Sequence, residues 1–143
     1  MNRREALFAT GALLAAAGTA QAADHSHHHH EGAHPWQAVL DTAGICIEKG
    51  EVCLTHCIML LGEGDRSMAA CAASVREMLA TCRALITLAG AESKFAPKLA
   101  ALCVDVCKSC EAECKKHAAQ HKPCKDCMES CAESAKACKT MIV

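Results

Sequence analysis

Cysteines recur at helical spacing in the last third of the chain, where their thiolates could bind soft metal ions. Eight of the thirteen cysteines lie within residues 103–138. The first four of these are separated by steps of four, three and four residues, and the last four by steps of three, four and seven. A helix turns once in about 3.6 residues, so each set of four lies on one face of its helix. Because thiolates are ligands for soft metal ions, we predict that these thiols point into the middle of a helical bundle and bind metal there.

The other five cysteines continue this pattern earlier in the chain. Three of them repeat at seven and four residues, and the other two lie in a helical stripe with methionine and valine. One histidine and two methionines near the turn between these two segments add ligands, and thioethers suit Cu(I). The predicted metal ligands are therefore Cys46, Cys53, Cys57, Cys71, Cys82, Cys103, Cys107, Cys110, Cys114, Cys124, Cys127, Cys131, Cys138, His56, Met59 and Met68.

Four predicted helices position these side chains. The first, second and fourth cover residues 36–61, 66–89 and 123–141. The third begins between residues 93 and 97 and ends at residue 118. Residues 62–65 form the first turn, with Asp65 or Ser67 as the next N-cap, and Gly90 is predicted to follow the second helix as its C′ residue. Pro123 suits the first turn of the last helix. We therefore predict an all-α fold, an antiparallel up-down-up-down four-helix bundle with a cysteine-lined core.

Composition and charge argue against several other classes of protein. The chain has 143 residues, enough for one small domain. Aromatic residues make up 2% of it, and the formal net charge of −1 does not favour a nucleic-acid partner. No pattern indicates a phosphate-binding glycine loop or a Ser-His-Asp arrangement. We therefore expect a protein that is not an enzyme, binds no nucleic acid and has no membrane span in its mature form.

Two segments precede the predicted helical domain of residues 36–143. Residues 1–22 combine a charged start, an apolar run too short to span a membrane and an Ala-x-Ala cleavage site, as in a signal peptide. The paired Arg3 and Arg4 favour the twin-arginine (Tat) export route over an ordinary secretory signal. Residues 23–35 carry six of the nine histidines and are predicted to be a flexible, metal-binding tail rather than a purification tag. We therefore expect an exported, periplasmic protein.

Other roles for the cysteines compete with metal binding. Thirteen thiols are too many to be explained as small buried side chains alone, and they give a core little apolar area. Disulfides between helices stay open, although the odd count leaves one thiol over and neighbours on one helix are poorly placed for them. Iron–sulfur spacing is matched only loosely, and no βαβ pattern supports a dithiol oxidoreductase. Among metals, zinc requires four ligands for each closed site, whereas a stripe of thiols and thioethers suits a chain of Cu(I) ions.

The helical domain resembles the copper storage proteins, and four segments carry the resemblance: GEVCLTHCIMLL, DRSMAACAASVREMLATC, CVDVCKSCEAEC and CKDCMESCAESAKAC. It implies a four-helix bundle that holds many Cu(I) ions on inward cysteines, a homotetramer of such bundles and a role in supplying copper to enzymes. His56 and Met68 match the family's ligands at the mouth of the bundle. Glu63 stands where a further methionine is expected, and Met59 is its proposed substitute.

The sequence therefore predicts a store of Cu(I) ions, for later supply to a copper-dependent acceptor protein or for copper detoxification. The alternatives are a metallochaperone that hands few ions to a partner and a disulfide-stabilised structural protein without metal. The first and third turns lie at the same end of an up-down bundle, so His56, Met59 and Met68 are expected to gather there with His117 and His121. Weaker ligands at this mouth would pass ions to the thiolates, and we expect Cu(I) to enter and leave at this end.

Overall fold

The computed structural model describes residues 34–142 of the chain. The predicted signal peptide (1–22) and all but the last two residues of the predicted histidine-rich tail (23–35) lie outside the described residues. The described part is helical throughout and contains no strand. Its elements are α1 (Gln37–Gly62), the 3₁₀ turn η1 (Arg66–Met68), α2 (Ala69–Gly90), α3 (Ala96–Lys115), α4 (Lys122–Cys138) and the 3₁₀ turn η2 (Lys139–Met141).

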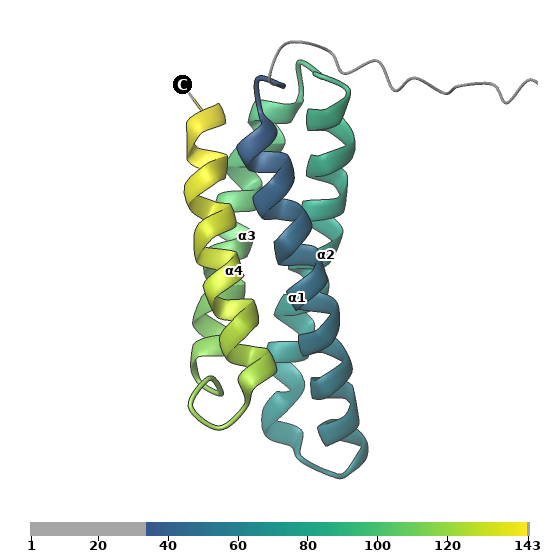
Figure 1. Cartoon of the computed structure of the whole chain (residues 1–143). Helices are drawn as coiled ribbons and strands as arrows, with labels where there is room; N and C mark the ends of the chain where they lie inside the picture. Colours follow the sequence, from purple (N-terminus) through teal and green to yellow (C-terminus); the bar gives the residue numbers. More distant parts are fainter. Residues whose placement is uncertain (1–33, 143) are drawn as a thin grey trace, which may run out of the picture. The chain divides into compact units, whose positions relative to one another are not determined.

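The four α-helices form an antiparallel bundle, which confirms the predicted fold class (Figure 1). Each helix packs against two others, in the pairs α1–α2, α2–α3, α3–α4 and α1–α4. In the described residues the diagonal pairs make no such contacts, so the helices surround a common axis. Short turns between consecutive helices explain the up-down-up-down order. The α1–α2 and α3–α4 turns lie together at one end of the bundle, as Figure 1 shows.

Every helix turns a stripe of small or sulfur-containing residues towards that axis. The stripe of α1 advances by four and three residues alternately, through Val39, Ala43, Cys46, Gly50, Cys53 and Cys57. This alternation keeps the stripe on one face because it averages 3.5 residues per turn. The corresponding stripes of the other helices contain Cys71 and Cys82 in α2, four cysteines in α3 and four in α4. The helices thus place sulfur where an ordinary bundle places leucine.

Two of the helices end in the same type of cap. At the end of α1 the N–H of Asp65 donates to the carbonyl of Leu60 and that of Gly64 to Leu61, and Gly64 has a φ of +96°. At the end of α2 the positive φ falls on Glu92, at +48°, and not on Gly90. The prediction for Gly90 was therefore wrong. Gly90 is the last helical residue, and the cap forms two residues further on.

Three other boundaries differ from the predicted ones because the ends of the helices tighten into 3₁₀ geometry. The second predicted helix opens with η1, in which the N–H of Ser67 donates to the Asp65 side chain at 3.0 Å. Asp65 is therefore the N-cap. The third helix ends at Lys115 and not at residue 118. After it, the N–H of His117 donates a hydrogen bond to the carbonyl of Cys114 and closes a tighter turn. The last helix ends at Cys138 and continues as η2.

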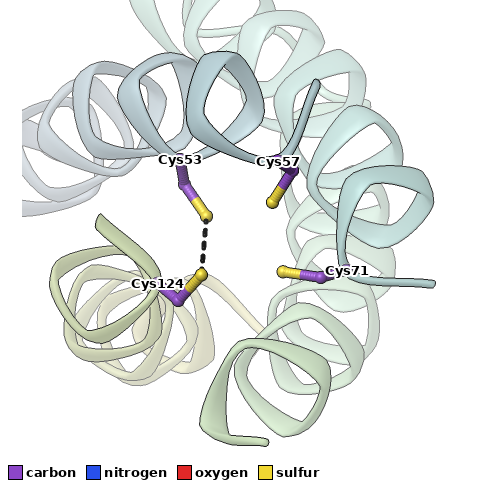
Figure 2. A group of neighbouring side chains, drawn as sticks. All are labelled: Cys53, Cys57, Cys71 and Cys124. Carbon is purple, nitrogen blue, oxygen red and sulfur yellow. Dashed lines mark hydrogen bonds between the residues drawn. The ribbon is translucent and has the colours of Figure 1, made fainter. Parts of the chain in front are cut away.

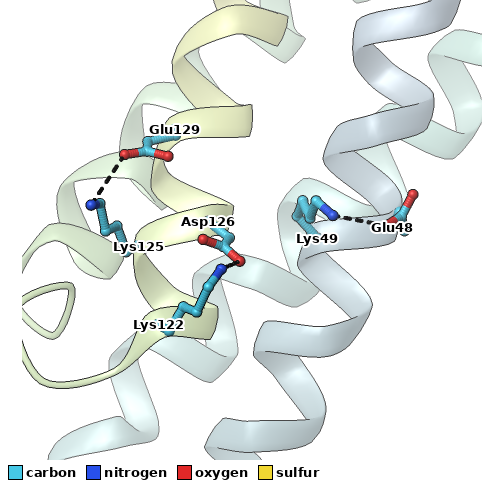
Figure 3. A network of polar contacts seen from close by, with 6 residues as sticks. All are labelled: Glu48, Lys49, Lys122, Lys125, Asp126 and Glu129. Atoms are coloured by element: carbon cyan, nitrogen blue, oxygen red, sulfur yellow. Dashed lines mark hydrogen bonds and ion pairs between the residues drawn. The ribbon is translucent and has the colours of Figure 1, made fainter.

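Charged side chains cover the outside of the bundle. Lys122 donates to Asp126 at 2.5 Å, and Lys49 donates to Glu48 at 2.8 Å on the neighbouring helix (Figure 3). Such exposed pairs are screened by solvent, so they stabilise the fold little. Within the described residues, none of the helices combines the length and the apolar character needed to cross a bilayer.

Two glycines in α1 have opposite surroundings and give a matched test of the packing. A Cβ at Gly50 would lie 2.6 Å from Cε of Met78 and 2.9 Å from Cδ2 of Leu79, whereas one at Gly44 would have no neighbour within 4 Å. Gly44→Ala is expected to stabilise the protein by about 0.5–1 kcal/mol through helix propensity. Gly50→Ala is expected to be less stable than Gly44→Ala by about 1–3 kcal/mol, because the added methyl group overpacks the core.

Chemical unfolding of the two reduced, metal-free variants measures both changes in the free energy of unfolding. If the two substitutions stabilised the protein equally, α1 and α2 would not approach as closely at Gly50 as the structure has them.

Candidate metal centre

All thirteen cysteines are buried, and each is 0% exposed. None forms a disulfide in the structure. They come from all four α-helices, so the thiols of distant parts of the sequence meet along the bundle axis. The structure thus brings every predicted cysteine ligand into one continuous interior.

The sulfur atoms form a ladder of contacts between neighbouring helices. Between α2 and α3, Cys71 and Cys114 have their Sγ atoms 3.6 Å apart, and so do Cys82 and Cys103. The other close pairs between helices are Cys46–Cys131 at 3.7 Å, Cys53–Cys124 at 3.8 Å, Cys82–Cys107 at 3.9 Å and Cys110–Cys127 at 4.0 Å. Within α3 the successive pairs Cys103–Cys107 and Cys110–Cys114 are 3.8 and 3.9 Å apart. An ion bound by one of these pairs therefore has further thiols within a few ångströms.

Several thiols lie close enough together to share a metal ion. Four groups have all their Sγ atoms within 4.8 Å of one another. One of them contains four thiols, and Figure 2 shows its side chains pointing towards one another from α1, α2 and α4. The groups are Cys53–Cys57–Cys71–Cys124, Cys46–Cys82–Cys107, Cys53–Cys114–Cys127 and Cys110–Cys127–Cys131. Cys53 and Cys127 each belong to two groups, so neighbouring metal sites would share thiolates.

Hydrogen bonds between thiols shift their pKa values in opposite directions. The hydrogen bond with Cys114 and those with its other thiol neighbours raise the pKa of Cys53, and burial acts in the same direction. The hydrogen bonds that Cys71 makes, that with Cys114 first among them, lower its pKa. The hydrogen bond with Cys103 likewise lowers the pKa of Cys138. Metal binding displaces the protons that the thiols retain, so the affinity for metal falls as the pH falls.

Imidazole rings gather at the end of the bundle where the α1–α2 and α3–α4 turns lie. Nε2 of His56 lies 2.9 Å from Nδ1 of His121, and the ring of His117 is 6.4 Å from that of His121. Met68, the last residue of η1, is completely buried, and Met59 is 57% exposed. The structure thus brings the three histidines His56, His117 and His121 together.

Two further polar or sulfur side chains lie on the axis and were not among the predicted ligands. Sγ of Cys46 donates to Sδ of Met78 at 3.4 Å, which places a thioether within the thiol ladder. Ser134 is fully buried, and its hydroxyl has no hydrogen-bond partner among the described residues. The spacing of α4 could have indicated Ser134, because it lies three residues after Cys131 and four before Cys138.

This arrangement suits a soft, low-valent ion better than a reaction centre. Thiolates and thioethers select Cu(I), which accepts few ligands, and a thiolate can bridge two ions. Closed tetrahedral sites would need four separate thiols for each ion. Because most of these contacts bring two or three thiols together, the interior is adapted to bind many ions along one axis.

Comparison with known proteins agrees with this chemistry. The family profile described as "Csp: Copper storage protein" matches residues 32–143. The chain is 28% identical over 105 residues to an uncharacterised cysteine-rich protein, YhjQ, of Bacillus subtilis (strain 168), a match that covers 73% of this chain and 94% of that protein.

Solved structures from the same organism show the same fold. Apo copper storage protein 3 of Bacillus subtilis superposes with a TM-score of 0.66 at 27% sequence identity, over 75% of this chain and 98% of that one. The structure described as Cu(I)-bound copper storage protein BsCsp3 superposes with a TM-score of 0.67 at 27% identity, over 75% of this chain and 97% of that one.

Proposed function

Because the chain belongs to the copper storage protein family, we propose that it holds Cu(I) for later supply to copper-dependent enzymes or for copper detoxification. The chain binds multiple Cu(I) ions as its cargo and is a metal-binding storage protein, not an enzyme. The observation that carries the proposal is the ladder of thirteen buried, unbridged thiols, which offers more ligands than delivery of one or two ions requires.

Cells that lack the protein distinguish supply from detoxification. If the store supplies enzymes, the activity of a copper-dependent enzyme should fall sooner in these cells after copper is withdrawn from the medium. If it detoxifies, their growth should stop at a lower copper concentration. If these cells were unchanged both in enzyme activity after copper withdrawal and in growth at high copper, the result would contradict the proposal.

We also propose that Cu(I) enters and leaves at the end that carries His56 and His121. Neutral imidazoles bind copper, and Nε2 of His56 lies 2.9 Å from Nδ1 of His121. His56 directly precedes Cys57, a member of the four-thiol group. Ligands weaker than thiolates can hold an ion and release it inwards. The partial exposure of both rings supports access from solvent.

Replacing His56 and His121 together by alanine is therefore expected to slow both uptake of Cu(I) and its removal by a chelator, with little change in final capacity. A tenfold slower rate corresponds to the loss of about 1.4 kcal/mol of transition-state stabilisation. Stopped-flow measurement of Cu(I) transfer from a chelator gives both rates. Met59→Ala is the matched control, because Met59 lies near the same turn but is exposed. Unchanged rates in the double variant would place the entrance elsewhere.

The remaining proposals concern location and assembly. The features of residues 1–22 support export by the twin-arginine route to the periplasm, with the histidine-rich segment as a first binding site for copper. A homotetramer is supported by large apolar side chains that are more than half exposed on the outside of α1, namely Ile45, Val52, Ile58 and Met59. Sedimentation of the mature protein tests the assembly.

A further inference from the structure

One group of thiols differs from the rest of the ladder in its number of ligands. Cys53, Cys57, Cys71 and Cys124 bring four Sγ atoms within 4.8 Å of one another, whereas each of the other three groups has three. In Figure 2 the four side chains point into one shared space from three helices. All four residues are completely buried.

The geometry fits a single tetrahedral divalent ion. With a metal–sulfur distance of about 2.3 Å, a tetrahedral Zn²⁺ site separates its sulfur atoms by about 3.8 Å. Sγ of Cys53 and Sγ of Cys124 are already 3.8 Å apart. We propose that this four-thiol group binds one divalent ion of the zinc class when the protein is poor in copper. The proposal goes beyond Cu(I) storage, since it assigns these thiols a different ion before copper is loaded.

The surrounding helices favour the charge that such a site would carry. Four thiolates and one divalent ion have a net charge of −2, which is costly to bury without compensation. Cys71 is the third residue of α2 and Cys124 the third residue of α4, so both lie at the positive end of a helix dipole. α4 has no side-chain cap and no acidic residue in its first turn, so its positive end is not offset locally. In front of α2, the Asp65 carboxylate accepts from the N–H of Ser67 in η1 and offsets part of the positive charge there. Cys57 lies more than one turn from the negative end of α1, where the opposing effect is weak.

Binding involves no oxidation or reduction. The four thiols release their protons to the solvent as they bind the ion, and the metal keeps its divalent state. Cu(I) has a stronger preference for thiolates, so it should displace the divalent ion as the store fills. The four-thiol group would then hold zinc and copper at different stages, beside the end of the bundle that carries His56 and His121.

Titration of the reduced, metal-free chain with Co²⁺ tests this proposal, because cobalt reports a tetrahedral thiolate site by intense visible bands and a thiolate-to-metal charge-transfer band. These bands should saturate at one Co²⁺ per chain. They should disappear when Zn²⁺ is added to one sample of the cobalt-loaded chain and when Cu(I) is added to another. Histidine-bound cobalt lacks the charge-transfer band, so the six histidines in residues 23–35 do not interfere with this reading.

Cys57→Ser should weaken cobalt binding by at least about tenfold, since changes even to outer-shell groups of metal sites cost that much. Cys57 belongs to this group alone, and so does Cys71, so Cys71→Ser provides a second variant if the first fails to fold. Cys138→Ser is the matched control, because Cys138 is buried but belongs to none of the four groups.

Three results would overturn the proposal: no tetrahedral cobalt bands, saturation at a stoichiometry other than one, or bands that persist unchanged in a folded Cys57→Ser or Cys71→Ser variant. Titration of the same preparation with Cu(I) separates these failures from a failure of copper storage.

Discussion

Loading the reduced protein with Cu(I) is expected to raise its thermal unfolding midpoint by at least about 20 °C, because ions that bind only the folded bundle stabilise it by mass action. One site in the presence of free ion at a hundred times its Kd contributes about 2.7 kcal/mol. Two independent sites therefore contribute about 5 kcal/mol, and each 1 kcal/mol shifts the midpoint of a domain of this size by about 4 °C. Further sites would add to this shift.

Circular dichroism at increasing temperature, with and without copper, measures the change. The metal-free, reduced protein should already show a helical spectrum, because the spacing of its apolar and polar residues specifies the bundle without metal. A spectrum typical of random coil before copper is added would contradict this expectation. It would indicate a domain that folds only around its metal, as zinc fingers do.

The second large effect concerns the reactivity of the thiols. In the folded, metal-free protein all thirteen thiols are expected to react with a thiol reagent at least about a thousandfold more slowly than in the unfolded chain. Each thiol is 0% exposed, so it reacts mainly after the fold opens, and global stabilities of about 5–15 kcal/mol make that opening rare.

Counting thiols in denaturant provides the control for this experiment. Gently isolated protein should give about thirteen free thiols per chain. Five or six disulfides per chain would contradict the storage function and favour the disulfide-stabilised structural alternative. Fast reaction of the folded protein with the full count retained would instead mean that the core is open to solvent.

The cysteine positions could be predicted well because a side chain every three or four residues leaves little freedom in a helix. The stripe in α3, from Cys103 to Cys114, fixes both the helix and the face that it buries. The same helical spacing places Met68, three residues before Cys71, in the core. Met59 lies two residues after Cys57, which is about 200° around the helix, so it is exposed on the outside of the bundle.

Other details depend on tertiary packing and could not be read from spacing alone. Met78 lies four residues before Cys82 and therefore on the same face of α2. Only the distance between its sulfur and that of Cys46 shows that it contacts the thiol ladder and does not merely pack in the core. The cap on Glu92 was missed because glycine is the usual residue for a positive φ, and Gly90 lies two residues earlier. The meeting of four thiols in one group depends on how α1, α2 and α4 are rotated relative to one another.

The amount of Cu(I) that the reduced protein binds tests the account most directly. Purified protein, free of oxygen, is titrated with Cu(I) in the presence of a competing chelator, and the bound copper per chain is read at saturation. We predict about ten or more ions per chain, because bridging thiolates allow close to one ion for each cysteine. Saturation at one or two ions would indicate a metallochaperone, and no binding would contradict copper storage altogether.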